Sequence, residues 1–268
     1  MSIELLAGFI LLGVFVGFMA GLLGIGGGGI LVPVLTTIFV YLEVPMAHLV
    51  HLALGTSMAC ITITSFSSLM AHHKRGGVVW PLVKAMVPGV VLGTFLATFL
   101  VALMNSKHLA IFFSIFMAYV SVQMFLDIKP KNTQHTGGKW ELFSVASFIG
   151  AISALVSIGG GSLTVPYLNW RNVDIKKAIG SSAALGFPIA IAGSIGYLIN
   201  GLSAKINLDY TVGFVYLPAV LLVAIPSYFT APLGAKMAHF LPVSILKKIF
   251  SLLLMLLSMK MLLLVFNG

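Results

Sequence analysis

The sequence predicts an all-α integral membrane protein made of two inverted repeats, each a broken helical hairpin followed by three transmembrane helices. Of its 268 residues, 59% are hydrophobic and only 8% are charged, whereas roughly a quarter are charged in a soluble domain. Apolar stretches such as residues 3–23, 82–103 and 246–266 are long enough to cross a bilayer, and they lack the alternating pattern of a membrane β-barrel. The length accommodates about eight helical segments, with each broken hairpin counted once.

An internal duplication predicts the two repeats. Residues 25–35 (IGGGGILVPVL) align with residues 158–168 (IGGGSLTVPYL) at an offset of 133, and seven of the eleven positions are identical. Upstream, a small residue at every fourth position indicates a close-packing helix face in both copies. These residues are Gly13, Gly17 and Gly21 in the first copy and Ala146, Gly150 and Ala154 in the second. We therefore expect a first repeat over residues 1–128, a cytoplasmic linker over 129–139 and a second repeat over 140–268.

Each repeat begins with an apolar helix that the glycine run interrupts, and a short apolar return segment follows. Three long apolar spans complete the repeat. In the first repeat, the expected segments are residues 3–23, 31–42, 47–71, 79–103 and 109–126. In the second repeat, they are residues 142–158, 163–169, 175–199, 211–235 and 245–266.

The distribution of lysine and arginine predicts how the repeats are oriented, because these residues concentrate in cytoplasmic loops. If each interrupted segment returns to the side from which it entered, the repeats are inverted. The 15 basic residues then divide twelve against three, with Lys107, Lys205 and Lys260 in the minority. If each segment is one kinked crossing, the division is eight against seven. The inverted arrangement is favoured, and it places both termini outside the cytoplasm, although the count does not fix how deeply the hairpins enter.

The two glycine runs are candidates for a binding site near the middle of the membrane, since matched helix breaks in inverted repeats point to the site of a secondary transporter. Glycine lets the backbone leave helical geometry, and the helix that follows presents unpaired N–H groups and the positive end of its dipole. Two such ends favour a small anion. The alternative is a tight helix reversal with a purely structural role. The candidate residues are Gly26, Gly27, Gly28, Gly29, Gly159, Gly160, Gly161 and Ser162.

Two hydroxyl-bearing motifs, Gly-Thr-Ser at residues 55–57 and Gly-Ser-Ser at residues 180–182, lie at equivalent depths in the two repeats. Their hydroxyls are candidate donors to an anion, because they add no buried charge. These residues are Thr56, Ser57, Ser181 and Ser182. Hydrogen bonds to their own helix or to a neighbouring helix are an equally open alternative. For the hydroxyls farther along the first of these spans, Thr62, Thr64, Ser65, Ser67 and Ser68, the structural alternative is favoured.

Basic residues precede both motifs. His48 and His51 share one helix face, and His51 aligns with Lys176. They are candidates for drawing an anion inward or, for histidine, for carrying a coupled proton, whereas solvation near a helix end is the favoured alternative. Arg171, just past the second return segment, is either a guide at the cytoplasmic mouth or an interfacial anchor. Residues 72–75 (His-His-Lys-Arg) are expected to be a solvated cytoplasmic anchor.

The sequence argues against an enzyme. Its six carboxylates lie near the ends of predicted spans, and it has no paired acids, no metal-ligand spacing and no Walker loop. We therefore expect no catalytic residue, no metal and no cofactor. The lack of buried carboxylates also argues against a cation transporter. The net charge of +9 comes from basic residues between apolar stretches, where they determine topology, so nucleic acid is not an expected partner.

The paired motifs, GIGGGGILVP at residues 24–33 and SIGGGSLTVP at residues 157–166, together with Gly-Thr-Ser at residues 55–57, resemble the sulfite exporter TauE/SafE family over the full chain. The resemblance implies an inner-membrane permease with eight helical segments in two repeats. It also implies transport of sulfur-containing anions such as sulfite, organosulfonates, sulfoacetate or thiosulfate. Ser162 replaces the fourth glycine of the run, so the two half-sites are not equivalent.

The expected function is that of a secondary transporter that moves a small sulfur-containing anion across the cytoplasmic membrane by alternating access, as the two repeats rock. A passive anion channel and a non-transporting membrane scaffold subunit are the alternatives. The expected partners are the anionic substrate and the lipid bilayer. The exact substrate, the direction of transport, the coupling ion and association into a homo-oligomer are left open.

Overall fold

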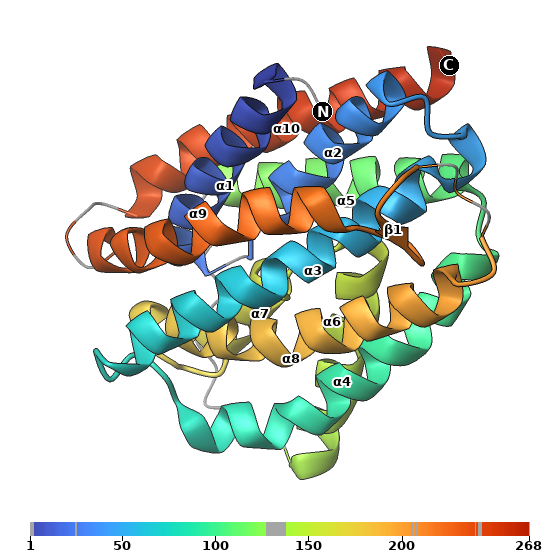
Figure 1. Ribbon diagram of the computed structural model, residues 1–268. Helices are drawn as coiled ribbons and strands as arrows, with labels where there is room; N and C mark the ends of the chain where they lie inside the picture. Colours follow the sequence, from blue (N-terminus) through green and yellow to red (C-terminus); the bar gives the residue numbers. More distant parts are fainter. Residues whose placement is uncertain are drawn as a thin grey trace.

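The computed structural model describes residues 3–24, 26–126, 138–204, 206, 208–238, 240 and 243–267. Within these residues the chain forms ten α-helices and one two-stranded β-hairpin (Figure 1). Seven of the described helices are long and apolar enough to cross a membrane. The chain is therefore an all-α integral membrane protein, as the sequence predicts. Most of the expected linker at residues 129–139 lies outside the described residues.

The helices follow the same order twice along the chain. The first series is α1 (Ile3–Leu23), α2 (Gly28–Tyr41), α3 (Met46–His73), α4 (Trp80–Leu103) and α5 (Ser106–Phe125). The second series is α6 (Lys139–Val156), α7 (Gly161–Trp170), α8 (Ile175–Gly201), α9 (Leu217–Met237) and α10 (Val243–Asn267). In each series a short helix follows the glycine run and three long helices come after it, as the sequence predicts.

One expected span is wrong at its start. Residues 211–216 form an antiparallel hairpin of β1 (Thr211–Val212) and β2 (Val215–Tyr216), and α9 begins only at Leu217. Gly213 turns the hairpin with a φ of 57°, which glycine adopts without a steric cost. A proline in the first turn of α9 then favours a helix start there. Apolar composition alone does not separate such a short strand from a helix.

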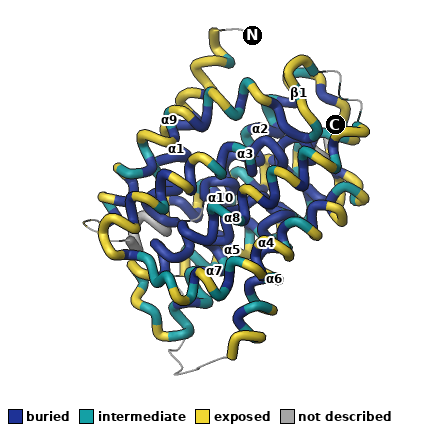
Figure 2. The backbone as a smooth tube through the Cα atoms, turned by 60° about the horizontal axis from the view of Figure 1, so that its bottom comes forward, coloured by how far each residue is buried: buried dark blue, intermediate teal, exposed yellow. Residues whose placement is uncertain are grey.

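The core of the molecule lies between the two series. Helices α3 and α8 pack against each other at the centre, and α3 also packs on α9 while α8 packs on α4. Around them, α1 packs along α9, α6 along α4, and α5 along α10. The apolar stretches of α3 and α8 are 78% and 61% buried, against 39–44% in the other candidate spans. Figure 2 accordingly shows buried backbone through the middle of the bundle and exposed backbone at its periphery.

The outer surface of the bundle is apolar. Leu96 and Leu100 on α4 and Leu221 and Phe229 on α9 are each more than half exposed. Side chains of this kind on an outer face mark contact with an apolar environment. In a bilayer, these faces of α4 and α9 contact lipid.

The stripe of small residues on α1 is a close-packing face, as predicted. Gly13, Gly17 and Gly21 lie so close to α9 that an added Cβ atom would overlap backbone atoms of that helix. Gly150 on α6 lies against the backbone of α4 in the same way. Small residues let helix backbones approach closely, which is how helices associate in a membrane.

The second interrupted segment doubles back on itself. The Tyr167 hydroxyl, near the end of α7, donates a hydrogen bond of 3.4 Å to Glu141 Oε1 at the start of α6. Arg171, directly after α7, lies 3.8 Å from the same carboxylate oxygen. The segment therefore ends beside its own beginning, which is the hairpin geometry that the inverted arrangement requires.

The return helices are short. α2 has 14 residues and α7 has 10, so at 1.5 Å per residue they extend roughly 21 Å and 15 Å. The hydrocarbon core of a bilayer is about 30 Å thick. Neither return helix is long enough to cross it alone.

Candidate functional site

Both glycine runs break the chain with a left-handed backbone conformation directly before a helix. Gly27, with a φ of 82°, precedes α2, and Gly160, with a φ of 74°, precedes α7. This conformation is costly for residues that carry a Cβ atom. Neither of these N-cap residues has a side chain, and neither helix has a side-chain cap. Because the first N–H groups of a helix have no acceptor within it, each break exposes an uncapped helix N-terminus.

The two breaks touch each other inside the bundle. A Cβ atom on Gly26 would lie 2.9 Å from the backbone nitrogen of Gly159 and 3.0 Å from its Cα atom. A Cβ atom on Gly28 would overlap the carbonyl oxygen of Ser157. The backbones of two segments at equivalent positions of the duplication thus approach at a distance that only glycine permits.

The breaks are held to the two central helices by equivalent contacts. Gly24 and Ser157 align in the duplication, since 157 − 24 = 133. The Ser157 hydroxyl donates a hydrogen bond of 2.9 Å to the carbonyl of Leu54 on α3. A Cβ atom on Gly24 would lie 2.7 Å from the carbonyl of Ile179 on α8. Each break therefore rests on the central helix that belongs to the other series.

The glycines of the two hydroxyl motifs have a packing role. Gly55 on α3 lies against the carbonyl of Phe214 in the β-hairpin. Gly180 on α8 lies against the carbonyl of Gly77 in the turn between α3 and α4. In both cases a Cβ atom would overlap the carbonyl oxygen. The absence of a side chain therefore lets the hairpin before α9 pack on α3 and the turn before α4 pack on α8.

The middle residues of the two motifs each accept a backbone hydrogen bond. Thr56 Oγ1 accepts from the Tyr216 N–H at 3.0 Å, and Ser181 Oγ accepts from the Val79 N–H at 2.8 Å. Tyr216 and Val79 are the N-cap residues of α9 and α4. Each hydroxyl therefore anchors the start of a long helix in the other series. Both keep an O–H group that can donate, so their role as anion ligands stays a prediction.

The last residues of the motifs differ from each other. The Ser182 hydroxyl donates a hydrogen bond of 3.1 Å to the carbonyl of Gly24 and so holds the first break. The Ser57 hydroxyl is fully buried and has no hydrogen-bond partner among the described residues. Of the four predicted hydroxyl ligands, Ser57 is the one without a structural partner.

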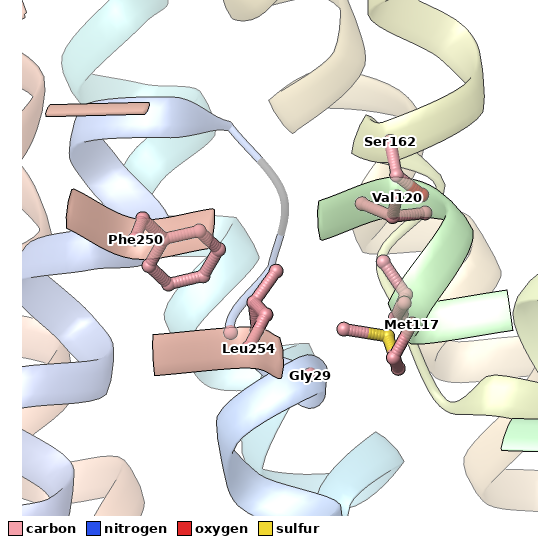
Figure 3. A pocket seen from close by; sticks show the side chains of 8 residues that line it. Gly29, Met117, Val120, Ser162, Phe250 and Leu254 are labelled. Atoms are coloured by element: carbon pink, nitrogen blue, oxygen red, sulfur yellow. The ribbon is translucent and has the colours of Figure 1, made fainter. Parts of the chain in front are cut away.

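Two small cavities adjoin the breaks. The first, which we call the α5–α10 cavity, is lined by Gly29 and Ser162 at the second residues of α2 and α7. Large apolar side chains of α5 and α10, Met117 and Leu254 among them, face each other across it (Figure 3). Its volume of about 10 Å³ admits about one water molecule.

The second cavity, the α3–α8 cavity, has the same volume of about 10 Å³ and a different lining. It lies directly at the contact between Gly26 and Gly159, and Ser65 and Ser68 of α3 are among its lining residues. Among the described residues, no charged side chain lines either cavity. The positive potential at the breaks therefore comes from backbone dipoles rather than from lysine or arginine.

The predicted basic residues have different surroundings. His51 is only 4% exposed, and its Nε2 and Nδ1 atoms lie 3.0 Å from the Val101 carbonyl and 3.2 Å from Ser106 Oγ. The expected solvated ring is therefore wrong for His51, because the end of α4 and the start of α5 surround it. His48 is half-buried and Lys176 is exposed. Their roles in anion access or coupling stay predictions.

Arg171 takes part in closing the second hairpin. Its guanidinium donates a hydrogen bond of 3.1 Å to the Tyr167 hydroxyl and lies near Glu141, and its side chain is 9% exposed. These contacts agree with the anchor alternative. A role as a guide at the mouth stays a prediction.

The sequence also suggested a solvated role for His72, and the structure contradicts it. His72 is 1% exposed, and its Nε2 atom lies 3.1 Å from the carbonyl of Gly21 on α1. Tyr197, its counterpart at an offset of 125, donates a 2.8 Å hydrogen bond to the carbonyl of Ala154 on α6. Gly21 and Ala154 are themselves counterparts at the offset of 133. The alignment of the two repeats therefore pairs His72 with Tyr197 and their carbonyl partners with each other. Histidine and tyrosine are too dissimilar for this equivalent contact to be recognised from the sequence.

In the described part of the chain, no group of three or more His, Cys, Asp or Glu side chains is placed to hold a metal ion. Cys60 is buried and free. What the breaks offer to a ligand is therefore backbone N–H groups and nearby hydroxyls.

The chain is a polytopic helical membrane protein in which two helix breaks meet in the interior. This arrangement is typical of transporters. The chain matches the family model described as sulfite exporter TauE/SafE over residues 9–261. It therefore belongs to the sulfite exporter TauE/SafE family.

Several curated proteins are similar to the chain. A probable membrane transporter protein of Haemophilus influenzae is 39% identical over 254 residues, which cover 94% of this chain and 96% of that protein. A probable membrane transporter protein of Methanocaldococcus jannaschii is 30% identical, with 85% and 84% coverage. The probable membrane transporter protein YunE of Bacillus subtilis is 27% identical, with 72% and 78% coverage. No solved structure matches the chain. The family and the names of these relatives indicate a membrane transporter rather than an enzyme.

Proposed function

We propose that this chain is a secondary transporter that moves a small sulfur-containing oxyanion, such as sulfite or thiosulfate, across the cytoplasmic membrane by alternating access. The observation that carries the proposal is the contact of Gly26 with Gly159 in the interior of the bundle. It brings two uncapped helix N-termini close to one another. Such ends favour a negative charge without a buried cation.

The proposal includes the inverted repeats over residues 1–128 and 140–268. Two connections support it, the β1–β2 hairpin and the turn after α3, which lie at opposite ends of the bundle (Figure 1). Each connection is bound to the hydroxyl motif of the other series, through Thr56 and Ser181 respectively. Releasing one connection at a time would open the bundle at one end while the other end stays closed.

The size of the cavities favours a carrier over an open channel. Each cavity at the breaks has a volume of about 10 Å³, enough for about one water molecule. An anion with several heavy atoms does not fit without movement of the surrounding helices. A passive channel would instead need a continuous polar path.

Counterflow in proteoliposomes tests the proposal. Vesicles that contain only this chain are loaded with unlabelled sulfite, and uptake of radiolabelled sulfite is followed. We expect labelled sulfite to accumulate transiently in exchange for the unlabelled pool. Current without exchange would instead indicate a channel, and the absence of any flux of sulfite or thiosulfate would indicate a non-transporting subunit.

Two glycine variants make the experiment specific to the breaks. Gly26→Ala introduces a Cβ atom against Gly159 at a φ of 73° and is expected to abolish counterflow. Gly8→Ala is the matched control, because nothing lies within 4 Å of a Cβ atom at that position of α1. Equal counterflow by both variants would contradict a functional role of the break contact.

A further inference from the structure

The contact between the breaks is surrounded differently on its two sides. α3 and α8 align at an offset of 125, which pairs Ile61 with Gly186 and Met58 with Ala183. On the α3 side, a methyl group of Ile61 would lie 3.2 Å from a Cβ atom on Gly26 and 3.6 Å from one on Gly159. Ile61 therefore fills the space beside the breaks.

On the α8 side a space of about 10 Å³ remains, although a Cβ atom on Gly186 would lie 3.0 Å from the carbonyl oxygen of Gly159. Gly186 and Ala183 stand there in place of isoleucine and methionine, and with Gly26 and Gly159 they line the α3–α8 cavity. The cavity therefore exists on one side of the break contact because the two repeats differ at these two positions.

A third difference between the repeats places a serine beside the cavity. Ser68, which lines the α3–α8 cavity, aligns with Gly193 of α8, since 193 − 68 = 125. Gly193 is covered by Met58, whose sulfur would lie 3.0 Å from a Cβ atom at that position. One side is thus filled by a thioether, and the other side keeps a cavity of about 10 Å³ with a serine among its lining residues.

The hydroxyl of Ser68 has no hydrogen-bond partner among the described residues, although the residue is only 2% exposed. The neighbouring serines of α3 are satisfied. Ser65 donates to the carbonyl of Ile61 at 2.6 Å, and Ser67 donates to the carbonyl of Tyr228 at 2.6 Å. A buried hydroxyl without a partner destabilises the protein, so its position on a cavity wall calls for a ligand.

We infer that Ser68 binds the substrate, donating its O–H to an oxygen atom of a small sulfur oxyanion seated beside Gly26 and Gly159 in the α3–α8 cavity. The inference rests on the proposed function. It places one asymmetric site on the α8 side of the breaks rather than two equivalent half-sites. Because the cavity admits about one water molecule in this conformation, the anion enters when α8 and α3 separate.

Binding of defined anions to the purified full-length chain tests the inference. The probes are sodium sulfite and sodium thiosulfate, and the dissociation constant is obtained from the anion dependence of the thermal unfolding midpoint. Ser68→Ala removes the donor and is expected to raise Kd about ten- to a hundredfold, as for the loss of a hydrogen bond to a charged group. Ala183→Met places the counterpart's side chain in the cavity and is expected to raise Kd at least as much.

Ser67→Ala is the matched control. It removes a buried hydroxyl from the same helix, and that hydroxyl binds a carbonyl of α9 rather than lining the cavity. We expect a lower unfolding midpoint without anion and an unchanged Kd, which separates stability from binding. If Ala183→Met does not fold, Ser68→Ala decides alone.

The outcomes distinguish the site from the function. If Ser68→Ala binds both anions with the native Kd while the native chain exchanges labelled sulfite, the site is wrong and the proposed function stands. If the native chain neither binds nor exchanges either anion, both are overturned.

Discussion

Replacing Thr56 by valine tests whether the hydroxyl motifs anchor the neighbouring helices. The substitution keeps the shape of the side chain but removes the acceptor of the Tyr216 N–H, which lies 3.0 Å away in the interior. A buried donor left without a partner costs about 1–3 kcal/mol. Ser181→Ala does the same to the Val79 N–H at the other end of the bundle. Because the two sites share no partner, the double variant is expected to lose about the sum of the two single losses.

The free energy of unfolding, measured by sodium dodecyl sulfate titration in mixed micelles, provides the assay. Thr36→Val is the control, since its buried hydroxyl donates only to the carbonyl of Val32 in its own helix at 2.7 Å. We expect a loss below about 1 kcal/mol there, because that carbonyl belongs to the hydrogen-bond ladder of the helix. If Thr56→Val keeps the native unfolding free energy and instead loses sulfite binding, the hydroxyl acts as a ligand and the anchoring argument is refuted.

Three further predictions concern other parts of the structure. Gly26→Ala is expected to cost about 2 kcal/mol or more of unfolding free energy, since its φ of 73° is unfavourable for alanine and its surroundings are full. Gly8→Ala, inside α1 with free space around it, should not lower the unfolding free energy and should raise it by up to about 1 kcal/mol, because alanine is the better helix former. Similar unfolding curves for the two variants would contradict this. Tyr197→Phe removes a buried hydrogen bond and should lower the unfolding free energy by about 1 kcal/mol, and an unaltered value would show that the bond contributes nothing. In a variant without the native cysteine, Lys107→Cys and Lys236→Cys, which lie near the C-terminal ends of the equivalent helices α4 and α9, should react with a membrane-impermeant maleimide from opposite sides of oriented vesicles. Labelling of both from one side would disprove the inverted arrangement, because parallel repeats place the two positions on the same face.

The order of the helices could be predicted from the sequence because it depends on local features. Glycine runs interrupt helices, and apolar stretches of about 20 residues form spans, so the duplication fixes the sequence of segments in each half. The β1–β2 hairpin could not be predicted, because strands of two residues are too short to show a periodic pattern in the sequence. Its position instead depends on Gly213 and on the contact of Phe214 with Gly55.

The partners of the candidate residues could not be predicted in the same way. Thr56 and Ser181 stand at equivalent positions, but the groups that they bind, the Tyr216 and Val79 amides, belong to helices of the other repeat. His51 was expected near a solvated helix end, yet α4 and α5 cover it. Such outcomes depend on how the repeats interlock, which neither composition nor spacing specifies.

The contacts shared by the two repeats explain why the frame can be symmetric while the cavity is not. In each shared pair one partner is a backbone atom: the Tyr216 or Val79 amide, or the Gly21 or Ala154 carbonyl. A backbone amide can bond to threonine or to serine, and a backbone carbonyl can bond to histidine or to tyrosine. The side chains can therefore differ between the repeats while the hydrogen bonds that hold the helices together are kept.

The space beside the breaks is instead formed by side chains alone. Which side is filled depends on two aligned pairs of residues. Ile61 aligns with Gly186, and Met58 aligns with Ala183, so the larger side chains are both on α3. Core packing changes with every methylene, so divergence there changes the cavity directly. It follows that substitutions at the shared hydroxyl contacts should alter stability with little effect on Kd, and that substitutions at Ser68 and Ala183 should alter Kd with less effect on stability.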